Sequence, residues 1–152
     1  MDYDAVKTVL EASVPFNRHL GIQFLELDSE HGVVRLPDDP GLMNHVGTQH
    51  ACGLFAVAEA AAGAAFVGRF AEHMGEITFL VRGASIDYVA LAKGPITATA
   101  TVDGGADEVL GRVRSDGRTR IPATVTLADE QDKTVAKVTV NYHVKSTNGH
   151  AG

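Results

Sequence analysis

The most uneven part of the hydropathy pattern is residues 51–68, where every residue except Glu59 is apolar or glycine. A run of this length without proline predicts a helix that is apolar on all sides, and such a helix is enclosed by protein or lipid. An ionised carboxylate in these surroundings is costly unless it is paired, hydrogen-bonded or protonated. We therefore expect Glu59 to lie at a cleft where the protein uses it.

A membrane span is the first alternative for residues 51–68. The run is at the short end for a span, it consists mostly of alanine and glycine, and Glu59 disfavours insertion. The chain has no second run of this kind, and its first residues lack the charged-then-apolar pattern of a signal peptide. Small residues recur on one side of the helix, at Ala56, Ala60, Ala64 and Gly68. We expect no membrane contact, but a sheet whose backbone comes close to that side.

Helical and alternating patterns divide the rest of the chain. Helices are predicted over 2–13, stopping before Pro15, and over 106–114, with Gly117 as terminator. Strands are predicted over 21–28, 33–36, 76–91, 95–102, 120–128 and 134–145. Turns or loops are predicted over 29–32, 37–43, 69–75 and 129–133.

Two strands carry more detailed predictions. In the first, simple alternation places Phe24 and Glu26 on one side and Leu25 and Leu27 on the other. In the long strand over 76–91, Gly83 interrupts the pattern, and this predicts a bend or a bulge.

The order of these elements indicates one α+β domain. The strands after the apolar helix follow one another directly, which favours antiparallel pairing. One helix cannot cover both faces of a six-stranded sheet, so we expect the sheet to curl around the helix. Its outer face is then polar or covered by another subunit. We assign residues 1–145 to the domain and 146–152, small, polar and terminal, to a flexible tail.

Composition and charge narrow the classes of function. The net charge is −6 and the pI is about 5.6, which argues against general nucleic-acid binding. Cys52 is the only cysteine, so no internal disulfide forms, and a reducing cytoplasm is the expected location. No Cys/His spacing indicates a metal site.

The segment that leads into the apolar helix resembles a known family. Asn44 is followed six residues later by His50, with small residues Ala51 and Cys52 behind it, and Glu59 comes nine residues after His50. This spacing is similar to that of hotdog-fold acyl-CoA thioesterases of the phenylacetate type. The ending of the long strand, residues 87–94, is similar as well. The resemblance implies a hotdog fold, thioester hydrolysis, and a homodimer or homotetramer that builds its site across a subunit boundary.

The chain departs from that family at two places. The family usually has two glycines after the histidine, where this chain has Ala51 and Cys52, with Gly53 one position later. A serine, threonine or asparagine that helps to place water in the family corresponds to Val81 here. The resemblance thus assigns Ala51, Cys52, Gly53 and Val81 to the substrate site.

Thioester hydrolysis needs a base or nucleophile and donors aimed at the developing oxyanion. Glu59 is the candidate for the first role, because an apolar setting raises the pKa of a carboxyl group into a useful range. The alternative is a buried structural carboxyl group bonded to a neighbouring backbone group or to a histidine. The backbone N–H groups of residues 51–53 at the helix start are the candidate donors. Asn44 either positions the reacting group or shapes its loop. His50 either orients the loop and takes part in catalysis, or serves as a helix cap.

The other candidate residues have weaker signals. Cys52, which the resemblance places among the substrate-binding residues, is either a nucleophile at a helix start or a small buried thiol. Arg82 and Lys93, with the arginines between residues 112 and 120, either meet the phosphates of coenzyme A or are solvated surface charges.

The sequence therefore predicts an acyl-CoA thioester hydrolase that needs no cofactor beyond the coenzyme A of its substrate. Two alternatives remain open. A hydratase on the same fold would need a histidine–acid motif that this chain lacks, and a non-catalytic acyl-CoA-binding protein agrees with Ala51 and Val81.

Overall fold

The structure is a computed structural model, and it describes residues 1–148. In chain order its elements are α1 (Tyr3–Ser13), α2 (Pro15–His19), β1 (Gln23–Leu27), β2 (Gly32–Leu36), α3 (Ala51–Arg69), β3 (Ile77–Tyr88), β4 (Ile96–Val102), α4 (Ala106–Asp116), β5 (Arg118–Ala128) and β6 (Thr134–Ser146). Short 3-10 turns lie at Pro40–Leu42 and Ala71–His73.

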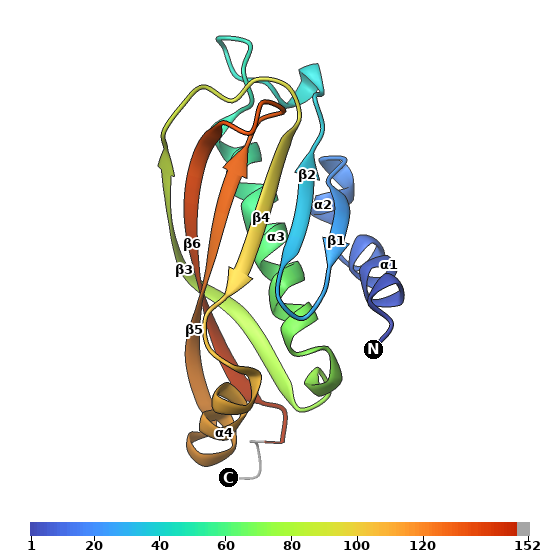
Figure 1. Ribbon diagram of the computed structural model, residues 1–152, viewed down its shortest axis with the longest axis vertical. Helices are drawn as coiled ribbons and strands as arrows, with labels where there is room; N and C mark the ends of the chain where they lie inside the picture. The colour runs from blue at the N-terminus through green and yellow to red at the C-terminus, as the bar shows by residue number, and fades with distance from the viewer. Residues whose placement is uncertain (149–152) are drawn as a thin grey trace.

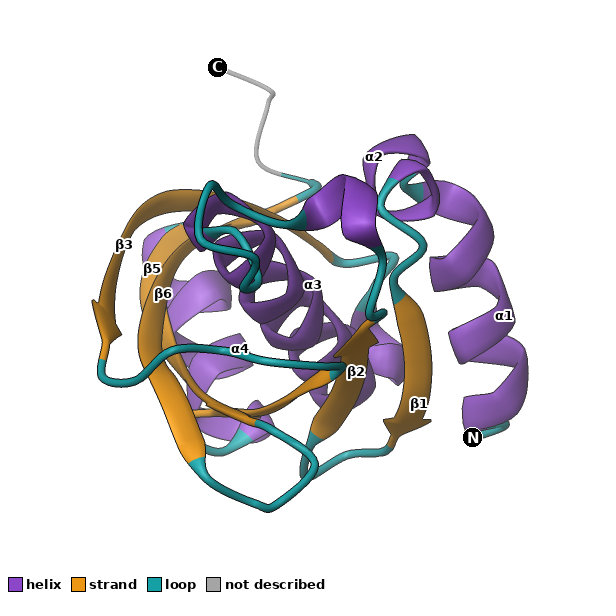
Figure 2. Cartoon of the chain, turned by 90° about the horizontal axis from the view of Figure 1, so that it is seen from above, coloured by secondary structure: helices purple, strands orange, loops and turns teal. Residues whose placement is uncertain are grey.

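The strands form one antiparallel sheet in the order β1-β2-β4-β5-β6-β3. The sheet curves around α3, which runs along its concave side (Figure 2). α1 and α2 lie beside β1, and α4 lies at the lower end of the molecule in Figure 1, against β5 and β6. This is the curled α+β architecture that the sequence predicts.

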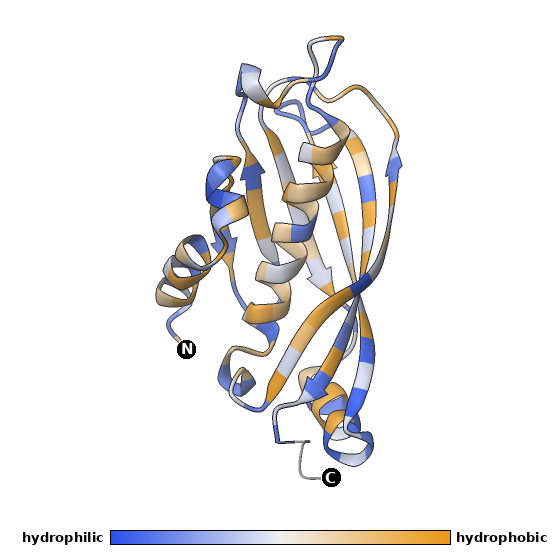
Figure 3. Cartoon of the chain, turned by 180° about the vertical axis from the view of Figure 1, so that it is seen from behind, coloured by the Kyte–Doolittle hydropathy of each residue, from blue (hydrophilic) through white to orange (hydrophobic). Residues whose placement is uncertain are grey.

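The long helix α3 forms the centre of the core. Its length and composition would also suit a membrane span, but its buried side packs against β2, β4 and β5. Figure 3 shows α3 as hydrophobic along its length apart from a hydrophilic band, and Glu59 is the charged residue within the apolar run. The core helix is therefore apolar because the sheet wraps around it.

Small residues let the β1–β2 hairpin come close to α3. A Cβ atom added at Gly68 would lie 2.1 Å from the backbone oxygen of Asp28, and one added at Gly32 would lie 2.6 Å from the backbone nitrogen of Ala65. Neither position accepts a side chain without movement of backbone. This confirms the close approach expected at the small-residue side of the helix.

The first strand differs from simple alternation. Phe24 pairs with Val34 but Glu26 pairs with Val33, so Leu25 is an extra residue in a β-bulge. After the bulge the alternation reverses, and Phe24 and Leu27 are both buried. The prediction that Leu27 shares a side with Leu25 was wrong, because one inserted residue turns every later side chain over.

Several element ends also differ from the prediction: β3 ends at Tyr88 rather than at residue 91, and α4 continues to Asp116 rather than ending at 114. Pro15 does end α1, but it also begins the short helix α2, because its fixed φ suits a first helical position. β5 begins two residues before the predicted strand. Ser146 is the last residue of β6, and the backbone N–H of Thr147 donates to the backbone oxygen of Glu76 at 2.9 Å. The expected tail therefore does not begin at residue 146. The rest of that tail, residues 149–152, lies outside the described residues.

The long strand β3 is an edge strand with an uncovered surface. It pairs with β6 alone, and all of its residues after Ile77 are exposed or half-buried. Val81 lies opposite Tyr142 and Gly83 lies opposite Asn141, so Arg82 is the extra residue of a bulge. The bend expected at Gly83 is therefore confirmed as a bulge at its neighbour.

Candidate active site

Three loops meet at the start of α3, and Gln49 holds them together. Its side-chain Nε2 donates to the backbone oxygens of Pro37 at 2.9 Å and Gly94 at 3.0 Å. Its backbone N–H donates to the Ala92 oxygen at 2.8 Å. Gln49 is 3% exposed, so these bonds form inside the protein. The loop before α3 is thus fixed to the loops that follow β2 and β3.

Asn44 organises the turn before the helix. Its side-chain oxygen accepts from the backbone N–H groups of Val46 and Thr48, both at 3.1 Å. Its Nδ2 donates to the Thr48 hydroxyl at 2.8 Å and to the Gln49 oxygen at 3.4 Å. Both ends of the amide are engaged within its own loop, so Asn44 shapes this loop, while its role in positioning the reacting group stays a prediction.

His50 is the N-cap of α3. Its Nδ1 accepts a hydrogen bond from the Cys52 backbone N–H at 2.9 Å, which leaves the proton of a neutral ring on Nε2. The N–H groups of Ala51 and Gly53 have no such partner among the described residues. The helix start therefore offers donors at positions 51 and 53, while the one at position 52 is taken.

Glu59 lies on the side of α3 that the sheet leaves open. Helical spacing aligns it with Cys52, Phe55 and Gly63, which are also exposed or half-buried. Within residues 1–148 its carboxylate takes part in no hydrogen bond or ion pair. Burial raises the pKa of Glu59 above its usual 4.5. This carboxyl group is half-buried and unpartnered, as a general base before substrate binds would be.

The helix start and Glu59 are separated along the axis of α3. Glu59 follows Gly53 by six residues, which is about 9 Å along the axis of an α-helix. A base and oxyanion donors must each lie within about 3 Å of the reacting group. Glu59 and the donors of its own helix start therefore lie more than one helical turn apart.

Tyr142 and Val81 lie on the face of the sheet next to the open side of α3. They are opposite one another on β6 and β3. The Tyr142 hydroxyl is buried without a hydrogen-bond partner among the described residues, and a Cβ atom at Gly63 would lie 3.8 Å from it. Burial, and then the charge of Glu59, raise the pKa of Tyr142. Tyr142 is thus a polar group near Glu59 that sequence reasoning missed, since its strand reads as ordinary alternation.

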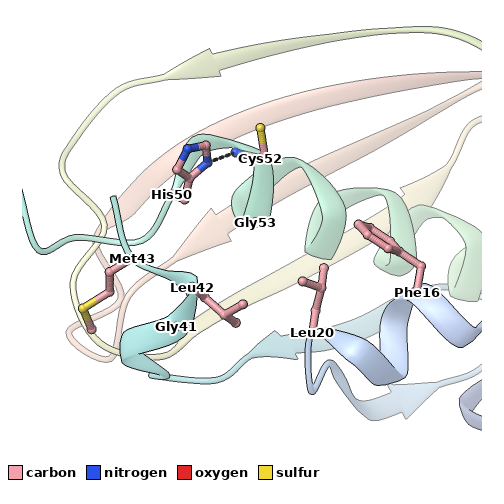
Figure 4. A pocket seen from close by; sticks show the side chains of 8 residues that line it. All are labelled: Phe16, Leu20, Gly41, Leu42, Met43, His50, Cys52 and Gly53. Atoms are coloured by element: carbon pink, nitrogen blue, oxygen red, sulfur yellow. Dashed lines mark hydrogen bonds between the residues drawn. The ribbon is translucent and has the colours of Figure 1, made fainter. Parts of the chain in front are cut away.

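A hollow of about 200 Å³ opens beside the start of α3 (Figure 4). Its walls are mostly apolar and are formed by Phe16, Leu20, Gly41, Leu42, Met43, His50, Cys52 and Gly53. Glu59 does not line it. The Cys52 thiol is exposed at this hollow, so the alternative of a buried thiol was wrong, because the first turn of α3 is not covered by the sheet. The Tyr88 hydroxyl donates to the Ala51 backbone oxygen at 3.0 Å, so β3 reaches across to this end of the helix.

The basic residues selected from the sequence do not form one group. Lys93 lies between Ala92 and Gly94, in the loop that Gln49 ties to the helix start. Arg82 lies on the outer side of the sheet, in a cavity with Arg118 and Arg120. Two other arginines are paired with acids, Arg112 with Glu108 and Arg114 with Glu76.

The match to known families covers almost the whole chain. Residues 3–144 match the model described as Domain of unknown function (DUF4442). The chain belongs to this family. No curated protein matches it.

Solved structures similar to this DUF4442 chain include proteins described as probable thioesterases or as members of a thioesterase family. A protein of unknown function from Pseudomonas aeruginosa, described as a probable thioesterase, aligns with a TM-score of 0.86 at 24% identity, over 96% of this chain and 97% of that one. The E. coli PaaI protein from the phenylacetic acid degradation operon aligns at 0.74 and 18%, over 93% and 91%. A thioesterase family protein from Silicibacter pomeroyi aligns at 0.76 and 20%, over 95% and 98%. These likenesses establish the hotdog fold for the DUF4442 chain.

Proposed function

We propose that this DUF4442 chain hydrolyses acyl thioesters of coenzyme A, with Glu59 as its base or nucleophile. The observation that carries the proposal is the half-buried Glu59 carboxyl group, which has no partner among the described residues and a raised pKa. Carboxyl groups perturbed in this way concentrate at functional sites. The solved structures with the same fold, among them probable thioesterases, support the same class of reaction.

The proposed enzyme is a homodimer in which each site uses two copies of the chain. The separation of Gly53 and Glu59 along α3 favours donors and a base that come from different helices. The uncovered edge of β3 suits a symmetric pairing with the β3 of a second copy, since unpaired strand edges invite such pairing. The side chains of Leu80, Val89 and Leu91, 74%, 55% and 65% exposed, would be covered in the assembly. A two-fold axis there would create two equivalent sites.

The reaction follows from these positions. The thioester carbonyl oxygen accepts hydrogen bonds from the backbone N–H groups of Ala51 and Gly53 in one copy. Glu59 of the second copy takes a proton from water, and the water oxygen attacks the carbonyl carbon. The C–S bond breaks with its electron pair remaining on sulfur, and the proton on Glu59 passes to the thiolate. If Glu59 attacks directly instead, an acyl anhydride forms first and water then cleaves it.

The apolar hollow beside the helix start suits the uncharged part of the substrate. The hollow adjoins Gly53. When the thioester carbonyl is held at Gly53, the part of the substrate on one side of the carbonyl would lie in the hollow, along Leu20 and Leu42. Apolar walls with few polar groups are typical of sites for small ligands.

Replacement of Glu59 by glutamine tests the proposal. Glu59→Gln should lower kcat/KM for acyl-CoA esters by at least about 100-fold, because it removes the base and keeps the shape of the side chain. Thiol release should be measured across a panel of acyl chain lengths. Glu72→Gln, an exposed glutamate beyond the end of α3, is the matched control and should hydrolyse like the wild type. Full activity in Glu59→Gln would eliminate this mechanism.

A non-catalytic acyl-CoA-binding protein is the second candidate. Ala51 carries a methyl group where the resembling thioesterases have glycine, and His50 already occupies the Cys52 N–H. Both features reduce what the helix start can offer a carbonyl oxygen. Saturable binding of acyl-CoA without thiol release at any chain length would favour this candidate.

A further inference from the structure

Basic side chains gather in a cavity on the outer face of the sheet. The cavity has a volume of about 390 Å³, and its walls are formed by Arg82, Arg118, Thr119, Arg120, His143 and Lys145. Figure 3 shows the hydrophilic colouring of β5 and β6 in their lower parts, near α4. We call this feature the basic cavity.

The register of the strands explains why these charges meet. Arg118 lies opposite Lys145 and Arg120 lies opposite His143. Their neighbours Ile121, Tyr142 and Val144 are buried on the helix side, so the basic side chains point outward. The bulge in β3 adds Arg82 from the other side of β6. The cavity is thus built by three strands and lies on the face of the sheet opposite to Glu59.

The basic cavity has no nearby countercharge in the part of the chain that the structure describes. There, no carboxylate oxygen lies within 4 Å of a charged nitrogen of Arg82, Arg118, Arg120 or Lys145. Asp103 and Glu108 lie in an adjoining hollow on the far side of Arg120, and Glu108 is already paired with Arg112. The chain has 19 acidic residues against 13 basic ones, so this arrangement does not follow from a shortage of acids.

His143 lies in the basic cavity and is surrounded by the same positive charges. Its Nδ1 is buried and lacks a hydrogen-bond partner among the described residues. Burial lowers the pKa of His143, and the charges of Lys145, Arg82, Arg118 and Arg120 lower it further. A group of like charges around an unsatisfied ring nitrogen is unfavourable when nothing is bound, and an anion in the cavity would offset it.

We propose that the basic cavity binds a ligand with two linked phosphate groups. Guanidinium groups bind phosphate oxygens in pairs of parallel hydrogen bonds, and Arg82, Arg118 and Arg120 supply three of them around one space. Lys145 adds a point charge. The linked phosphates belong either to the nucleotide end of coenzyme A or to a separate phosphate compound. The site does not depend on Glu59 or on hydrolysis, so its test is independent of the thioesterase proposal.

Calorimetric titration with inorganic pyrophosphate at pH 7 and low salt tests the site. The wild type should bind one pyrophosphate per chain, with an affinity that falls as salt is added. Arg118→Gln/Arg120→Gln should bind at least tenfold more weakly. The control Arg18→Gln/Lys137→Gln removes the same charge from exposed positions outside the cavity and should bind like the wild type.

A second measurement tests whether pyrophosphate binds in the basic cavity itself. The ring signals of His143 in an NMR spectrum should shift as pyrophosphate is added, while those of His31, paired with acids elsewhere, should not. Absence of saturable binding to the wild type would overturn the proposal. So would equal affinity in the site variant and the control variant.

Competition identifies the source of the phosphates. If coenzyme A displaces pyrophosphate and pantetheine, which has no phosphate, does not, the ligand is the nucleotide end of coenzyme A. If coenzyme A does not compete, the cavity takes a separate phosphate compound. Glu59→Gln should bind pyrophosphate like the wild type in either case, which keeps this result independent of any loss of hydrolysis.

Discussion

Glu59 holds a carboxyl group in surroundings that favour its protonated form. Burial raises its pKa above 4.5, and no cation within the described part of the chain offsets that cost. An arrangement of this kind lowers stability near neutral pH. We interpret the lost stability as the consequence of keeping a base available for substrate.

The raised pKa predicts how stability depends on pH. The folded protein holds the Glu59 proton more tightly than the unfolded chain, so its free energy of unfolding falls as pH rises from 4.5 through the folded pKa. Glu59→Gln should therefore be more stable than the wild type at pH 7, by about 1.4 kcal/mol for each unit of the rise. Below pH 4.5 this advantage should disappear.

Urea unfolding at pH 4 and pH 7, at one fixed protein concentration, measures the difference. Glu72→Gln is the control, since its exposed carboxyl group should give the same small effect at both pH values. An advantage of Glu59→Gln that stays constant or grows toward low pH would contradict the assigned cause.

Residues differ in how clearly the local sequence pattern indicates their importance. Glu59 stands out because it is the charge in an apolar run, and His50 because it precedes that run. Gln49 and Tyr142 do not, because their importance comes from partners far along the chain: Gln49 bonds across 45 residues to Gly94, and Tyr142 lies beside Gly63. No local pattern encodes such contacts.

At the level of elements, strong periodicity predicted the fold well. The apolar helix, the strands and the Gly117 end of α4, where φ is 76°, all follow from local pattern. The bulge at Leu25 does not, since it depends on how β1 pairs with β2. The basic cavity is hidden for the same reason, because the register of β5 and β6 brings Arg118 and Lys145 together.

Two glycine-to-alanine substitutions should have opposite effects on the free energy of unfolding, because only Gly68 lies where α3 contacts the β1–β2 hairpin. Gly68→Ala should lower the free energy of unfolding by about 1–3 kcal/mol, since its methyl group would overlap the Asp28 backbone oxygen. Gly111→Ala, inside α4 with nothing within 4 Å of an added Cβ, should raise it by up to about 1 kcal/mol. Urea unfolding at pH 7 measures both. Stabilisation by Gly68→Ala would show that the hairpin does not press on the helix.

As a single chain, the molecule leaves three of its features without a partner. The β3 edge is unpaired, one side of α3 is uncovered, and the proposed donors and base are about 9 Å apart along the helix. One symmetric pairing through β3 would complete all three. The association of two chains and catalysis would then depend on the same surface.

Mixing two inactive variants tests whether the site is shared. Ala51→Pro and Gly53→Pro each remove one backbone N–H within the first helical turn, where proline is tolerated. The variant of these two that loses hydrolysis is mixed with Glu59→Gln, and the chains are unfolded and refolded together. Each mixed dimer then has one site with intact donors and an intact Glu59, and one site that lacks both.

Random pairing makes half of the dimers mixed, so about a quarter of the wild-type activity should return if the site spans two chains. Variants refolded alone should remain inactive, which controls for recovery by refolding itself. If the donors and Glu59 acted within one chain, no pairing could restore a site, and the mixture would stay inactive. Activity in the mixture would therefore show that the donors and Glu59 come from different copies, and its absence would remove the shared site from the mechanism.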